Sequence, residues 1–243
     1  MNNQIYETPE QEVVGQKSRS GNLSFAKIFF YMFLGLALTT GVAFGVGALL
    51  LYKCPDFTVF RNVYLGLMIG SGVTLIIMTF VINLVFLRGK HSILIPALIY
   101  CILMGVLLST FVILLEGNWW LLGEAFGITA GVFLILTLIA VVSKGNMSPL
   151  LMLGFGLIMG SGILILVNLL TRSSTLYWVI SFAIFAAMMF ITIFDIWNIK
   201  KITERGEMTT NLELYCAFTL YVDFIYILIR VIYFLLFIYG RSK

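Results

Sequence analysis

Seven long runs of apolar residues constrain this chain more than any other feature. Each has about twenty residues or more, enough to cross the hydrocarbon core of a bilayer as a helix. In chain order they are Phe25–Leu51, Asn62–Leu87, Ser92–Leu115, Trp119–Val142, Ser148–Leu170, Thr175–Ile199 and Leu214–Tyr239. The polar breaks between them are short, so neighbouring helices are expected to be antiparallel. The sequence predicts an all-α polytopic membrane protein, a seven-transmembrane-helix bundle over residues 25–239. A polar, disordered N-terminal tail is expected at 1–24 and a short C-terminal tail at 240–243.

The composition excludes several classes of protein. Hydrophobic residues make up 61% of the chain and charged residues 11%, against roughly a quarter charged in a soluble domain. A soluble enzyme, a nucleic-acid binder and a disordered regulator are therefore excluded, and the net charge of +4 comes from scattered basic residues. The single histidine, His91, and the isolated Cys54, Cys101 and Cys216 have no metal-ligand spacing. We predict no metal site, no cofactor and no enzymatic activity.

The basic residues in the tails, in the loops and near the ends of the apolar runs predict the orientation in the membrane. Nine Lys and Arg residues fall on the side of the N-terminus and five on the other side. Because cytoplasmic loops carry the excess of Lys and Arg, the N-terminus is expected in the cytoplasm and the C-terminus outside.

A few charged residues lie inside or at the end of the apolar runs. They are Glu124, Asp195, Asp223, Arg230 and Arg88. An ionisable group at membrane depth costs at least about 2.5 kcal/mol on insertion scales. These residues are therefore the candidates for a functional site.

Asp195 and Asp223 are expected to lie in the same half of the bundle. Asp195 comes five residues before Lys200, about 8 Å from the cytoplasmic end of its helix. Asp223 comes nine residues after Leu214, about 14 Å from the cytoplasmic end of the next helix. The two helices are consecutive and joined by a short loop, so the two carboxylates are predicted to face each other.

The other two charges in the runs have more than one interpretation. Glu124 lies near the outer end of the fourth run, five residues after Trp119. It either reaches the outer interface or attracts cations to an outer vestibule. Arg230 lies two turns after Asp223 on the same helix face. It is interpreted as an internal partner for Asp223 or for a backbone carbonyl.

Short motifs around these residues resemble the Bax inhibitor-1 family. Residues 194–199 read FDIWNI and residues 220–225 read LYVDFI, and the family pairs an FD or YD motif with LYLDFIN. The EAFG motif at 124–127 is similar to the fourth helix of bacterial members, and VFLR at 85–88 matches a basic residue at the end of the second helix. The resemblance extends from about Phe25 to Tyr239.

The resemblance implies a fold and a function. It implies that the seventh helix is central and that the protein is a pH-sensitive calcium leak channel, with calcium as the permeating ion. By motif, Asp195 and Asp223 are the pH sensor, and Arg88 is a latch on the helix-six aspartate. Bacterial-type motifs and short tails favour a bacterial plasma membrane. The chain has Asn198 where the family has glutamine, and Tyr226 where it has asparagine.

Elementary electrostatics predicts that the two aspartates titrate together. Two ionised carboxylates about 4 Å apart repel by about 4 kcal/mol at an effective dielectric constant of 20. A proton shared by the pair removes that repulsion, and the titration then belongs to both residues. Ionisation of both loosens the contact and attracts cations, whereas a nearby Arg88 stabilises the ionised form.

Several alternatives stay open at the level of sequence. A proton-coupled transporter uses the same aspartates as proton carriers, and a non-conducting interaction or stress-regulatory protein needs them only as structural groups. An intramembrane aspartyl protease is disfavoured because Asp223 lacks the preceding glycine of the GxGD motif, and a retinal protein because the seventh run has no lysine. The direction of pH gating, the oligomeric state and the protein partners are not fixed by the sequence.

Overall fold

The computed structural model describes residues 9–53, 57–88, 92–115, 118–206 and 208–240. Over these residues the chain forms seven helices and no strand. Each helix has a stretch long and apolar enough to cross a membrane, which confirms the predicted fold class. The helices are α1 (Pro9–Lys53), α2 (Phe57–Arg88), α3 (Leu94–Leu114), α4 (Trp120–Val142), α5 (Ser148–Thr171), α6 (Ser174–Arg205) and α7 (Thr210–Gly240).

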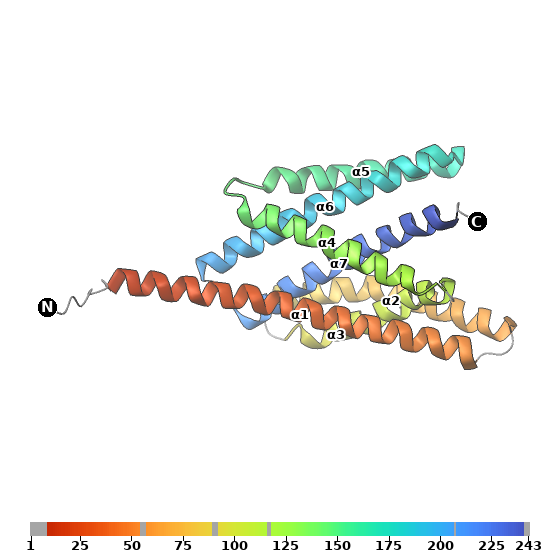
Figure 1. Cartoon of the computed structure of the whole chain (residues 1–243), viewed down its shortest axis with the longest axis horizontal. Helices are drawn as coiled ribbons and strands as arrows, with labels where there is room; N and C mark the ends of the chain where they lie inside the picture. The colour runs from red at the N-terminus through yellow and green to blue at the C-terminus, as the bar shows by residue number, and fades with distance from the viewer. Residues whose placement is uncertain (1–8, 54–56, 89–91, 116–117, 207, 241–243) are drawn as a thin grey trace.

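Helix α7 lies in the middle of the bundle, with α5 and α6 on one side of it and α1 to α3 on the other (Figure 1). It packs against α1, α4 and α6, and ring contacts such as Phe86–Tyr215 and Tyr100–Phe218 join it to α2 and α3. Half of its most apolar window is buried, the largest share among the seven helices, against 11% for α5. The central position implied for the seventh helix is thus confirmed, and α5 packs mainly along α6.

Residues in a left-handed backbone conformation end α5 and α6. Arg172, with φ 49°, follows α5, and Gly206, with φ 74°, follows α6. A left-handed residue just after a helix reverses the chain and satisfies its last carbonyl groups. Ser173 then caps α6, because its side chain accepts a hydrogen bond from the Leu176 N–H at 3.4 Å. Such short connections allow consecutive helices to run antiparallel.

The first helix begins earlier than the sequence predicted. Helix α1 starts at Pro9, so residues 9–24, which were predicted as a disordered tail, are helical. Extending an existing helix adds one hydrogen bond per residue without a new nucleation cost, and the hydrophobic run at Phe25 supplies that nucleus. Residues 1–8 of the predicted tail lie outside the described residues.

Close approach of the helices does not occur at the GxxxG motifs, although such motifs usually serve this purpose. A Cβ atom added to Gly105 of α3 would lie 2.7 Å from both the Thr39 carbonyl oxygen and Val42 Cβ of α1, and one added to Gly154 of α5 would lie 2.7 Å from Ile191 of α6. By contrast, a Cβ atom would meet nothing within 4 Å at any glycine of the GxxxG motifs: Gly41, Gly45, Gly66, Gly70, Gly123, Gly127, Gly131, Gly156 and Gly160. These motifs therefore do not bring helices of the bundle together.

A buried polar cluster joins α1, α3 and α7. The hydroxyl groups of Thr39 and Tyr221 are 2.7 Å apart, and the Thr39 hydroxyl donates to the Cys101 carbonyl oxygen at 3.1 Å. Thr39 and Tyr221 are almost fully buried. A hydrogen bond between helices satisfies polar groups that lipid cannot, so this cluster fixes the central helix against its neighbours.

Candidate functional site

Asp195 and Asp223 come together between α6 and α7. The helices pack along each other, and the two carboxyl groups are close enough to interact directly. Asp223 is 4% exposed, whereas Asp195 is partly buried. The two aspartates are thus brought together by the fold as predicted, while their role in sensing pH stays a prediction.

Buried apolar residues flank Asp223 on its own helix, and no basic group among the described residues forms a salt bridge with it. Its Oδ2 atom is buried without a hydrogen-bond partner, and Leu220, Phe224 and Ile227 on the same helix are fully buried. Leaving a buried polar group unsatisfied costs about 1–3 kcal/mol, and more when the group is charged. Native proteins keep few such groups, and each calls for an explanation such as a functional role.

Thr192 completes the site and was not identified from the sequence. It lies three residues before Asp195 on α6, is fully buried and sits beside the Asp223 carboxyl group. Its hydroxyl donates to the Met188 carbonyl oxygen at 2.8 Å. Because a hydroxyl carries one hydrogen, the same group can instead donate to an ionised Asp223. The signal in the sequence was its spacing, since residues i and i+3 share a helix face.

A second contact ties α2 to the neighbourhood of the pair. Tyr215 of α7 lies near Asp195, its hydroxyl donates to Asn83 Oδ1 at 2.9 Å, and its ring stacks on Phe86 with centroids 3.9 Å apart. Asn83 therefore links two helices, as single polar residues in membrane spans often do. Sequence reasoning missed Tyr215, because aromatic residues are common throughout these spans.

Arg88 is the last residue of α2, but its side chain lies outside the described residues. Its predicted contact with Asp195 stays a prediction. The position of the helix end is compatible with it, since Phe86 in the last turn of α2 already reaches Tyr215 beside Asp195.

Glu124 and Arg230 lie toward the other end of the bundle. Tyr239 donates to Glu124 Oε2 at 3.3 Å, and the Trp120 ring meets Tyr239 edge-on. Arg230 lines a cavity of about 270 Å³ between α6 and α7, together with Trp178 and other aromatic residues. The cation-attracting role of Glu124 stays a prediction, and so does a backbone carbonyl partner for Arg230.

Ion pairs are scarce in the bundle. Within the described residues the one salt bridge joins Lys200 and Glu204 of α6, 3.6 Å apart, so Arg230 makes none there with Asp223. Lys200 also donates to the Val141 carbonyl oxygen at 2.7 Å. A cation there complements the carbonyl end of α4, so Lys200 serves helix packing rather than the aspartate pair.

Comparison with known proteins identifies the family. The sequence pattern of the family described as Inhibitor of apoptosis-promoting Bax1 matches residues 22–239. The chain belongs to this family. The match covers all seven spans and both aspartates, which confirms the resemblance that the motifs indicate.

Individual relatives of the chain are bacterial proteins. The chain is 25% identical to the inner membrane protein YbhL of Escherichia coli over 97% of its own length and 98% of that protein. It is 27% identical to an uncharacterized membrane protein of Streptococcus pyogenes over 91% of its length and 93% of the relative. A shorter match, 33% identical, covers 57% of the chain and 60% of an uncharacterized protein of Borreliella burgdorferi. An integral membrane protein is thus supported both by its spans and by its relatives.

Proposed function

We propose that this member of the Bax inhibitor family is a calcium leak channel whose conductance depends on pH through Asp195 and Asp223. The observation that carries the proposal is the close approach of two carboxyl groups in the bundle interior. Asp223 is buried, and neither carboxyl group has a salt bridge in the described part of the chain. Asp195 and Asp223 each lie in a motif that resembles one of the family, and this resemblance supports the same function.

The pair can act as a two-state element. With one shared proton, the carboxyl groups attract each other and hold α6 against α7. With both groups ionised, they repel by about 4 kcal/mol at 4 Å and an effective dielectric constant of 20. That energy is enough to shift the populations of two conformations by about a thousandfold. The same negative charge attracts a divalent cation, so flux is proposed to rise as the pair loses its proton.

Other titratable groups lie beside the pair and must be separated from it. Tyr215 and Cys216 of α7 are near Asp195, and Glu213 of α7 is near Cys216. Tyrosine and cysteine ordinarily titrate above pH 8, whereas a glutamate is a carboxyl group like the aspartates. Glu213→Gln is therefore the matched control, because Glu213 is also buried but does not belong to the pair.

The test is calcium flux into liposomes. The purified protein is reconstituted into liposomes that contain a calcium-sensitive dye, and flux is recorded from about pH 5 to pH 9. Passive calcium entry that rises with pH is expected for the wild type and for Glu213→Gln, and a nearly pH-independent flux for Asp223→Asn. Liposomes that do not leak at any pH contradict the proposal and favour the non-conducting interaction protein. Accumulation driven by a proton gradient contradicts it in favour of the transporter.

The orientation is proposed from the charge count and the helix directions. The start of α1 and the end of α7 lie at opposite ends of the bundle (Figure 1), and the basic excess places the N-terminus in the cytoplasm. Reporter fusions after Gly206 and Lys243 are expected on opposite sides, with Gly206 inside. Fusions on the same side contradict the seven-span topology.

A further inference from the structure

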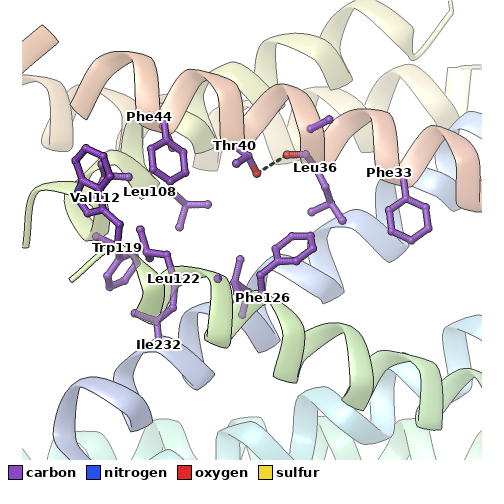
Figure 2. A pocket seen from close by; sticks show the side chains of 15 residues that line it. Phe33, Leu36, Thr40, Phe44, Leu108, Val112, Trp119, Leu122, Phe126 and Ile232 are labelled. Atoms are coloured by element: carbon purple, nitrogen blue, oxygen red, sulfur yellow. Dashed lines mark hydrogen bonds between the residues drawn. The ribbon is translucent and has the colours of Figure 1, made fainter. Parts of the chain in front are cut away.

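A large hollow among the described residues lies away from the aspartate pair. A cavity of about 840 Å³ lies between α1 and α4, with α3 and α7 completing its walls. Figure 2 shows Thr40 of α1 across an open centre from Phe126 of α4. At one end of the cavity Phe44 meets Trp119 edge-on, with ring centroids 6.3 Å apart. The cavity is partly open, and Phe44 and Trp119 at its rim are 39% and 48% exposed.

The chemistry of the walls excludes water as the occupant. Thr40 and Trp119 are the lining residues whose side chains can form hydrogen bonds. The hydrogen of the Thr40 hydroxyl is already used, because it is donated to the Leu36 carbonyl oxygen at 2.8 Å (Figure 2). Trp119 lies just before the start of α4, at one end of the cavity. Apolar cavities without free polar partners stay dry. This cavity is therefore not part of a route for hydrated cations.

An empty cavity of this size is also unfavourable. Side chains around a void lose the dispersion contacts that they would make with a neighbour. Apart from Trp119, every lining residue lies within a membrane span, so the medium at the mouth between α1 and α4 is lipid hydrocarbon. We infer that the cavity is a binding site for the acyl chains of a phospholipid from the surrounding bilayer.

The length of the cavity suits an acyl chain. Along α1 the cavity extends from Phe33 to Phe44, eleven residues or about 16 Å. Its volume is about 840 Å³, so hydrocarbon chains can lie in it along the helices. A flexible hydrocarbon chain is much narrower than a helix, and it adapts to the curved walls.

An acyl chain at this site reaches the central helix. Leu228 and Ile232 of α7 line the cavity, and both are buried. Lipid that only surrounds the protein contacts exposed residues such as Leu166 of α5, which is 66% exposed. Contact of lipid with Ile232 therefore distinguishes a bound chain from bulk bilayer.

Photolabelling with a phospholipid that carries a diazirine on its acyl chain tests the inference. The full chain is reconstituted in vesicles that contain this lipid and irradiated, and labelled residues are mapped by mass spectrometry. Label on Ile232 or Leu228 of α7 is expected in addition to label on α5. No label on α7 in the wild type overturns the inference, and cross-linking between two chains at α1 and α4 would assign the cavity to a second copy.

Filling the cavity provides the matched comparison. Gly123 lines the cavity, and a Cβ atom on it meets nothing within 4 Å, so Gly123→Leu starts a side chain from this wall of the cavity. Gly127, one turn along α4, has equally open surroundings but does not line the cavity. We expect Gly123→Leu to lose the label on α7 and Gly127→Leu to keep it, with equal label on α5. Ala37→Leu fills the cavity from α1 as a second variant, and unchanged α7 label in both filled variants overturns the inference.

Discussion

The contact between α1 and α3 at Gly105 gives a sharp prediction for Gly105→Ala. The added methyl carbon lies 2.7 Å from the carbonyl oxygen of Thr39, whereas a carbon and a carbonyl oxygen ordinarily approach to about 3.3 Å. The oxygen belongs to the backbone of α1 and cannot rotate away. The two helices must therefore separate locally by about 0.6 Å.

The free energy of this separation follows from the contacts that it disturbs. Overpacking costs about 1–3 kcal/mol. The bond from the Thr39 hydroxyl to the Cys101 carbonyl oxygen, now 3.1 Å, lengthens beyond hydrogen-bond range, which costs about 1 kcal/mol. The higher helix propensity of alanine offsets about 1 kcal/mol of this loss. The net loss is about 1–3 kcal/mol, or a melting temperature about 2–12 °C lower.

Helicity measured against temperature in detergent, by circular dichroism, checks this prediction. The matched control is Gly127→Ala, where a Cβ atom meets nothing within 4 Å. Only the higher helix propensity of alanine acts there, so the melting temperature stays the same or rises. If Gly105→Ala melts at or above Gly127→Ala, the inferred close packing of α1 on α3 is refuted.

Two further predictions concern the surroundings of the aspartate pair. Thr192→Val keeps the shape of the side chain but removes the hydroxyl that can donate to ionised Asp223. A hydrogen bond to a charged group contributes about 1.5–3 kcal/mol, which is partly offset here because the hydroxyl gives up its bond to Met188. The midpoint of the curve of flux against pH should therefore move by about one pH unit toward alkaline pH. Flux that keeps its midpoint excludes this donor role. Arg88→Ala should alter the leak rate or its pH dependence while membrane insertion stays intact. The control Arg205→Ala, which removes an equal charge from the same end of the bundle, should alter neither. An Arg88 variant whose flux follows that of the wild type from acid to alkaline pH contradicts the latch.

The sequence predicted the spans well because long apolar runs leave few other structures open to a chain. Helices α3, α4, α5 and α7 begin and end within four residues of the predicted spans, whereas α2 begins five residues earlier and α6 ends six residues later, at Arg205. The main error was α1, whose polar segment from Pro9 carries no apolar pattern to mark it as helical. Bilayer hydrocarbon explains the success, since it allows only helices or closed barrels to cross.

The rotation of each helix was harder to predict. In lipid, both the inward and the outward faces of a span are apolar, so hydrophobicity does not show which face packs inside. For this reason the sequence did not show that Gly105 packs closely whereas Gly127 faces open space. The aspartates were predictable because a charge in a membrane must face inward, but Thr192 and Tyr215, which are ordinary in composition, became visible only through their contacts.

The double-mutant cycle of Asp195 and Asp223, read as calcium flux in liposomes over about pH 5 to 9, tests the central claim most directly. If the two carboxyl groups share one proton, Asp195→Asn and Asp223→Asn should each abolish most of the pH response, and the double variant should be little worse than either. A pH response that survives in both single variants, or losses that simply add, would contradict a shared-proton gate.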